Sequence, residues 1–172
     1  MKKILFALFT IISLNCQGQE TEKYNLGFEN QKQKEALSDG WFKWGDYDLK
    51  IDDIAYSGEH SGKITSDQNG SSFGSIAYEI PANYEGKKIK LEGFMKIKDV
   101  ENGFAGLLLR IDGNGNYLAF DNMQNQKITG TKDWQKYTII LDYPQEAEKI
   151  FVAGILNGKG EAWFDDFILS TI

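Results

Sequence analysis

The chain has 172 residues, of which 41% are hydrophobic, 26% are charged and only 2 are proline. This composition excludes collagen-like, disulfide-knot and strongly disordered proteins, and the length suits one domain better than two. A formal charge of −6 supplies no basic surface for a phosphate backbone, so we expect no nucleic-acid partner. One cysteine and one histidine exclude an internal disulfide framework and a metal centre built on several thiolates or imidazoles.

The first 18 residues have the pattern of a secretory signal peptide. Lys2 and Lys3 precede an apolar run at residues 4–14, and polar residues follow. A membrane-spanning helix needs roughly 20 apolar residues, so we expect no transmembrane segment. Two processing routes remain open, cleavage after Gly18 or lipidation of Cys16 as a lipoprotein cysteine, and the departure from the familiar lipobox before Cys16 favours cleavage. Either route predicts a secreted, periplasmic or cell-envelope protein.

After a short N-terminal tail at residues 19–23, we expect residues 24–172 to form one domain. We find no internal repeat, low-complexity tract or linker in this stretch. Its segments are short, alternate in polarity and are separated by glycine and asparagine, which is typical of β-strands joined by turns.

The predicted strands follow in chain order. They cover residues 76–80, 88–98, 105–112, 117–120, 137–141, 150–156 and 162–169. In the second, a two-residue period places Ile89, Leu91, Met95 and Ile97 on the core face. In the third, the core face carries Ala105, Leu107, Leu109 and Ile111. Residues 112–116 predict the hairpin turn before 117–120, and residues 157–160 predict a turn between the last two strands.

Short strands at regular spacing predict an all-β fold, an antiparallel β-sandwich. Jelly-roll topology is our first choice. The pattern of strands alone does not separate it from an immunoglobulin-like sandwich.

Four short motifs occur in an order that resembles a known family: NLGFE at 25–29, GW at 40–41, SGEHSGK at 57–63 and WFDDF at 163–167. Together they resemble the calcium-containing jelly-roll carbohydrate-binding modules, which have a galactose-binding-like sandwich. The stretches DNM at 121–123, GTKDWQKY at 130–137 and WFDD at 163–166 look closer still to a jelly-roll domain that bacteria append to secreted hydrolases. The resemblance spans nearly all of residues 24–172, and it implies a fold more specifically than a ligand.

In these modules a structural calcium ties the first strand to the Ser-Gly loop and the last strand. The resemblance therefore implies that Glu29 and one of Asp165 and Asp166 supply side-chain oxygens. The remaining implied ligands are carbonyl oxygens near Gly27, Gly62 and Lys63. Calcium takes six to eight oxygen ligands at about 2.3–2.6 Å and tolerates irregular geometry, which suits such a set. The alternative is that these carboxylates are solvated edge charges or turn caps.

We expect a glycan to bind on the polar sheet face opposite the core. The candidate ligand-binding residues on this face are Glu92, Phe94, Arg110, Asp112, Tyr117, Asp121 and Asn122. An aromatic ring can bury the apolar C–H face of a sugar while charged and amide groups bind its hydroxyls. The alternative is a solvated face with cross-strand ion pairs, each worth little.

Trp44 and Tyr47 are two further candidates, because they lie in a segment that we expect to be a loop at the rim of the sandwich. They could also fold back onto the core. Alternation places Trp163, Asp165 and Phe167 on one strand face. The aromatic residues that we expect to be structural are Phe28, Trp41, Trp134, Trp163 and Phe167.

The residues give little support for an enzyme. His60 is the sole histidine, no serine lies in a Gly-x-Ser-x-Gly motif, and no phosphate-binding glycine loop precedes a helix. We therefore predict a non-catalytic, secreted module that binds carbohydrate. The alternative is an extracellular or envelope module that binds another protein and no sugar.

Overall fold

Segments of alternating polarity form β-strands over most of the described chain. The computed structural model describes residues 24–31, 37–67 and 72–172. The strands are β1 Trp41–Gly45, β2 Asp48–Asp52, β3 Ser61–Ser66, β4 Phe73–Pro81, β5 Lys88–Gly113, β6 Asn116–Asp121, β7 Gly130–Asp142 and β8 Lys149–Thr171. A 3-10 helix, η1, covers Gln124–Gln126. All strand pairs are antiparallel, so the predicted β-sandwich with jelly-roll topology is confirmed.

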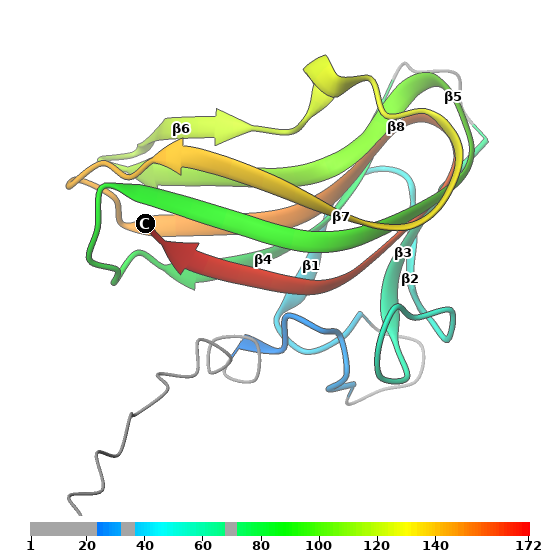
Figure 1. Ribbon diagram of the computed structural model, residues 1–172, viewed down its shortest axis with the longest axis horizontal. Coiled ribbons are helices and arrows are strands. Elements are labelled where there is room, and N and C mark those ends of the chain that lie inside the picture. The colour runs from blue at the N-terminus through cyan, green and yellow to red at the C-terminus, as the bar shows by residue number, and fades with distance from the viewer. Residues whose placement is uncertain (1–23, 32–36, 68–71) are drawn as a thin grey trace, which may run out of the picture.

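Two long strands, β5 and β8, take part in both layers of the sandwich (Figure 1). We call the layer that contains β1, β4, the first half of β8, the second half of β5 and β6 sheet 1. Sheet 2 contains β2, β3, the second half of β8, the first half of β5 and β7. In Figure 1, β5 and β8 run side by side along the molecule, and the loop between β2 and β3 lies beside the N-terminal segment.

The core lies between the two sheets. Sheet 2 contributes Ile89, Leu91, Met95 and Ile97, and sheet 1 contributes Ala105, Leu107, Leu109 and Ile111, all at most 1% exposed. The two-residue period predicts both sets, and both are confirmed. Their burial removes apolar surface from water, which stabilises the fold by about 25 cal/mol per Å².

The motif at the start of the domain belongs to this core. Leu26 and Phe28 are fully buried, and the Phe28 ring stacks on Trp41 with centroids 4.1 Å apart. The indole N–H of Trp41 donates to the Asn25 carbonyl at 2.9 Å, and the Phe167 amide donates to the Leu26 carbonyl at 3.1 Å. The prediction that these aromatic residues are structural is therefore confirmed for Phe28, Trp41 and Phe167.

The predicted turn at residues 157–160 is wrong. These residues continue β8 without a reversal, and β8 bends there from sheet 1 to sheet 2. The predicted strands at 88–98 and 105–112 are likewise two halves of β5, which bends at 99–103 with register shifts around Glu101. Glycines permit both turns and bends, so the sequence signal is the same, and the paired bend in the neighbouring strand decides the outcome.

Glycine is required at the bend because the two strands approach closely. Gly158 has a φ of +84°, and a Cβ there would lie 2.4 Å from the Glu101 carbonyl oxygen. Gly160 has a φ of +123°, and its Cβ would lie 2.7 Å from the Asp99 carbonyl oxygen. The left-handed backbone and the close approach exclude a side chain at each position.

The expected signal peptide, Cys16 and the tail at 19–23 lie outside the described residues. Within the described ranges, no helix is long and apolar enough to cross a membrane.

The bend gives a stability test with a matched control. Gly115, in the β5–β6 turn, also has a positive φ of +74°, but a Cβ there would meet nothing within 4 Å. We expect Gly115→Ala to cost about 1–2 kcal/mol for its backbone conformation. Gly158→Ala must also displace the β5 main chain, so we expect a cost of about 3 kcal/mol or more. Urea unfolding measures both, and equal costs would contradict the tight bend.

Candidate functional site

A groove of about 540 Å³ opens on the outer face of sheet 1. Aromatic and apolar side chains form most of its lining, from Trp44, Phe73, Phe104, Leu108, Phe120 and Ile155. Polar side chains enter from Arg110, Asn122, Gln124 and Asn157. Apolar walls with a few convergent polar groups are typical of a small-molecule or glycan site.

The order of residues along the strands explains the groove. Ile155 on β8 and Leu108 on β5 form the low centre of the groove, since they line it and are only 6% and 5% exposed. Larger side chains stand around them: Trp44 on the edge strand β1, Phe73 on β4, Phe104 on β5 and Phe120 on β6. Aromatic walls around a floor of aliphatic side chains produce the hollow.

Arg110 is the charged side chain among the described lining residues, and it is held in place. Its Nε and Nη2 donate to the two carboxylate oxygens of Asp112, both at 2.7 Å. The two residues are two apart on β5, so they share a face. The guanidinium carbon also lies 5.7 Å from the Phe151 ring centroid, within cation–π range. The hydrogen bonds to Asp112 raise the pKa of Arg110, while burial lowers it.

Amide side chains supply the other polar groups of the groove. Asn157 Nδ2 donates to the Ser72 carbonyl at 2.7 Å, which orients this side chain at the groove wall. Asn122 Oδ1 accepts the Gln124 amide at 3.2 Å, in the turn that starts η1. Amides both donate and accept hydrogen bonds, as sugar hydroxyls do.

The predicted ligand-binding residues divide between two faces. Arg110, Asn122 and Trp44 line the groove, whereas Glu92 and Phe94 lie on the first half of β5, in sheet 2. The expectation of one polar face is therefore wrong, because β5 bends from one sheet to the other between Phe94 and Arg110. The outer face of sheet 1 is also largely apolar around Arg110 rather than polar.

Four further predicted residues lie outside the groove lining, among them Asp112, whose carboxylate holds Arg110. Tyr117 is 68% exposed on β6, and Asp121 accepts the Met123 amide at 2.8 Å, where it stabilises a turn. Tyr47 is 2% exposed, and its hydroxyl donates to the Ser72 carbonyl at 2.8 Å. The expectation of an exposed rim loop is thus wrong for Tyr47, and Trp44 lies in strand β1 rather than in a loop.

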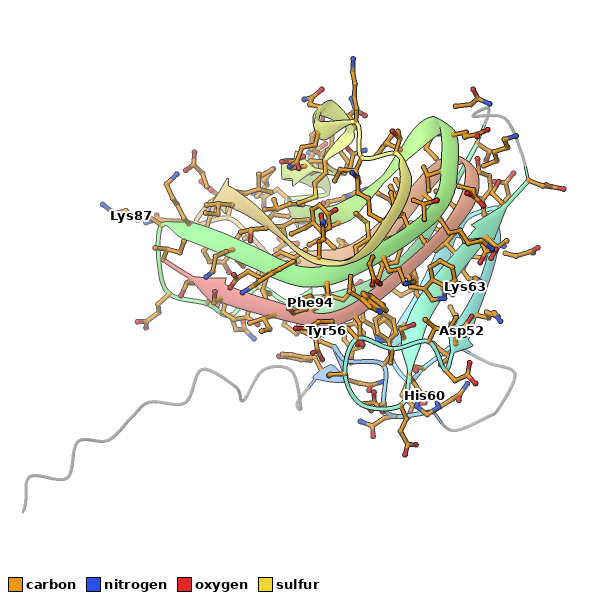
Figure 2. All side chains as sticks on the ribbon, turned by 45° about the vertical axis from the view of Figure 1, so that its right-hand side comes forward. Asp52, Tyr56, His60, Lys63, Lys87 and Phe94 are labelled. Carbon is orange, nitrogen blue, oxygen red and sulfur yellow. The ribbon has the colours of Figure 1, made fainter. Side chains whose placement is uncertain are left out.

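Phe94 belongs to an aromatic cluster on sheet 2. Its ring stacks on Tyr56 with centroids 3.5 Å apart, and Tyr56 meets Trp134 edge-on at 6.0 Å. Figure 2 shows Tyr56 and Phe94 side by side, with Tyr56 on the loop between β2 and β3. Beside them, Glu92 pairs with Lys90 at 2.7 Å and with Lys136 at 2.8 Å. The first pair lies within β5 and the second crosses to β7, so this face has the ion pairs that are the alternative to a binding site.

The carboxylates implied as calcium ligands converge on the loop at residues 53–60. Glu29 accepts the main-chain amides of Glu59, at 3.1 Å from Oε1, and His60, at 3.2 Å. Asp166 Oδ2 accepts the Ser57 hydroxyl at 2.8 Å, and its Oδ1 lies beside Gly27. These oxygen atoms come from three distant segments, which is a donor set that suits calcium.

Asp165 is fully buried because this loop covers it. Its Oδ2 accepts the amides of Tyr56 at 2.8 Å and Ser57 at 3.1 Å, and its Oδ1 accepts the Asp166 amide at 2.7 Å. Burial raises the pKa of Asp165 to about 7, although these donors oppose the shift. A bulge, with Asp166 at φ 48°, turns Phe167 into the core while Asp165 faces Phe94. Trp163, Asp165 and Phe167 therefore do not share one face.

Gly62 and Lys63 lie at a different place from the carboxylates. Both are inside β3, which pairs with β2 on one side and β8 on the other. The Lys63 ammonium lies 2.6 Å from Glu161 and 4.4 Å from the Trp163 ring centroid. Among the described residues, no three His, Cys, Asp or Glu side chains form a group that could hold a metal ion. A calcium site here would depend on main-chain carbonyl oxygens.

Five aromatic or amide residues of the groove are absent from the candidates that the sequence predicts: Phe73, Phe104, Phe120, Gln124 and Asn157. The two-residue period that places Leu108 and Arg110 outward also reaches Phe104, and the β5–β6 hairpin pairs Arg110 with Phe120. Phe104 and Phe120 were therefore predictable from the sequence. Phe73 and Asn157 come together through the pairing of β4 with β8, which no local pattern indicates.

Glu92 provides a pH test on sheet 2. Hydrogen bonds from Lys136 and Lys90 lower the pKa of Glu92 below its usual 4.5. The charged carboxylate therefore stabilises the fold above that value, and the contribution is lost as the pH falls through the lowered pKa. We expect Glu92→Gln to reduce the free energy of unfolding by about 0.5–1 kcal/mol at neutral pH and by almost nothing in acid.

Urea unfolding across the acid range measures this difference. Glu85→Gln, in the exposed segment between β4 and β5, is the control for loss of one negative charge. A Glu92→Gln penalty that stays constant with pH would show that the ion pairs are not its cause.

Comparisons with known proteins agree with this fold. No protein-family model matches the chain. Solved structures with high similarity include TmCBM61 in complex with beta-1,4-galactotriose, with 18% identity and a TM-score of 0.55, covering 86% of this chain and 96% of that one. The xylan-binding domain from CBM 22 has 15% identity and a TM-score of 0.56, covering 84% of this chain and 95% of that one. At these identities, the likeness shows the fold.

A curated protein is similar in sequence. It is an uncharacterized HTH-type transcriptional regulator, YbfP, of Bacillus subtilis (strain 168), 32% identical over 161 residues. The match covers 88% of this chain but 52% of the regulator, so the chain spans about half the length of this relative.

Proposed function

We propose that this protein is a non-catalytic carbohydrate-binding module that holds a glycan in the groove on sheet 1. The observation that carries the proposal is the groove itself, in which aromatic walls stand beside an oriented arginine and three amide side chains. Aromatic rings bury the apolar face of a sugar ring, and the arginine and amides satisfy its hydroxyls. The solved structures with this fold support the proposal, because one is bound to a galactotriose and another is described as xylan-binding.

The similarity to the bacterial regulator does not conflict with this proposal. Among the described residues of this chain there is no pair of α-helices of the kind that a helix-turn-helix requires. The similarity therefore concerns the sandwich, and a ligand-binding module can serve an exported protein or a regulator. Nor do the described groove residues include the paired carboxylates that a glycosidase needs.

Binding on the groove is tested by one aromatic variant on each face. Phe120 lines the groove and is 46% exposed, and Tyr56 is 45% exposed in the cluster on sheet 2. We expect Phe120→Ala to weaken retention by about tenfold, because a sugar ring loses its stacking partner. Tyr56→Ala is the matched control and should leave retention unchanged. Affinity gels with soluble xylan, galactan, mannan and β-glucan measure the effect.

If Tyr56→Ala weakens retention and Phe120→Ala does not, the glycan binds at the cluster of Tyr56 and Phe94 on sheet 2.

If no glycan retains the wild-type protein in calcium-containing buffer, the protein is better explained as an extracellular or envelope module that contacts another protein. Export itself is part of this proposal and rests on the signal-peptide pattern of residues 1–18.

We also propose a structural calcium between the N-terminal segment and the loop at 53–60. Glu29 and one of Asp165 and Asp166 would supply carboxylate oxygens, and main-chain carbonyls near Gly27 and in this loop would complete the ligand set. When bound, the ion would hold the N-terminal segment, the loop and β8 together. The main chain of Gly62 and Lys63 takes part in the sheet ladder, which makes their carbonyls less suitable.

Removal of the metal tests this proposal. Because a ligand that binds only the folded state stabilises it by mass action, excess EGTA should lower the melting temperature by about 5 °C or more, and added calcium should restore it. In Glu29→Gln protein the EGTA effect should shrink. A melting curve that EGTA leaves unchanged would leave the carboxylates as hydrogen-bond acceptors for the loop.

A further inference from the structure

We infer that the groove selects uncharged polysaccharides over acidic ones, because Asp112 neutralises Arg110, the cation among the described residues of its lining. This inference deepens the proposed function and rests on it. Arg110 is the charged side chain among the described residues that line the groove. An arginine in a sugar site would ordinarily favour a uronate or sulfate, since its fork matches an anion in two places.

In this groove the protein's own Asp112 carboxylate already binds the arginine. Asp112 takes both hydrogen bonds from the Nε–Nη2 edge of the guanidinium, at 2.7 Å each, so a ligand carboxylate finds only the other edge free and meets the repulsion of the Asp112 carboxylate beside it. The pair is partly buried, with side-chain exposures of 39% for Arg110 and 20% for Asp112. Burial weakens solvent screening, so the two charges cancel closely at the groove.

The neighbouring charges have the same arrangement. Lys149 is the β8 residue opposite Asp112 in the strand register, and its ammonium lies 3.0 Å from the Glu79 carboxylate on β4. This cation is thus also matched by an acid. With a net charge of −6 for the whole chain, the molecule repels polyanions at longer range.

The clamp still leaves Arg110 useful to a neutral sugar. A guanidinium has five N–H donors, and Asp112 takes two of them. The Phe151 ring on one side and Asp112 on another fix the group. Its remaining donors are therefore preorganised for hydroxyl or ring oxygens, while Asn122 and Asn157 can accept as well as donate.

The experiment compares neutral and acidic glycans on matched charge variants. Affinity gels with xylan, galactan, mannan and β-glucan are run beside gels with polygalacturonate, alginate and hyaluronate. Asp112→Asn keeps the shape of the clamp but frees the arginine charge. Asp142→Asn removes the same charge on β7, from a side chain that is 85% exposed and pairs with Lys88, and it is the control.

We expect gels that contain neutral glycans to retain the wild-type protein, and gels that contain acidic glycans to leave its migration unchanged. Asp112→Asn should bind at least one acidic glycan about tenfold more tightly than wild type, in a way that high salt reverses. Asp142→Asn should behave as wild type. In Arg110→Gln/Asp112→Asn protein the gain should vanish, because its source is the guanidinium. Melting temperatures identify any variant that fails to fold, and the wild-type comparison stands without variants.

Two failures are distinguishable. Wild-type protein that binds acidic glycans as tightly as neutral ones overturns this inference and leaves the proposed function intact. Wild-type protein that neither panel retains overturns the proposed function, and the inference with it.

Discussion

The structure depends on the close approach of two bent strands. β5 and β8 pair along nearly their whole length, and both bend at the same level, at residues 99–103 and 157–160. A bend in one strand alone would break the hydrogen-bond ladder, so both must bend together. The glycines at the contact allow this, because main-chain atoms lie where a Cβ would otherwise stand. The two layers of the sandwich are therefore two halves of one continuous ladder.

The bend also determines which residues can act together. On a strand, side chains two apart share a face, and Arg110 and Asp112 form their clamp on this basis. Phe94 and Arg110 are an even number of residues apart, so a straight strand would place them on one face. The bend lies between them, and Phe94 therefore faces out from sheet 2. The groove aromatic residues consequently come from β1, β4, β5 and β6, while Phe94 joins Tyr56 from a loop.

A second contact system closes one end of the sandwich. The loop at 53–60 covers Asp165, and Glu29 and Asp166 accept hydrogen bonds from the same loop. The neighbouring carboxylates of Asp165 and Asp166 repel, and donation from main-chain amides to Asp165 offsets part of that cost. This end joins the first described segment to the last strand, whereas the groove lies on a sheet face whose strands the bend has already fixed.

The sequence by itself determined the fold class, the core faces of both halves of β5 and the β5–β6 turn, because these follow from local periodicity and from residues that tolerate positive φ. It also predicted Arg110, Asn122 and Trp44 as candidate binding residues, and all three line the groove. Only the tertiary structure decided that 157–160 is a bend, that Tyr47 is buried and that Phe94 lies on the other face. Glycine serves a turn and a bend equally well, and the choice between them depends on a neighbouring strand more than 50 residues away in the sequence, as Glu101 and Lys159 show.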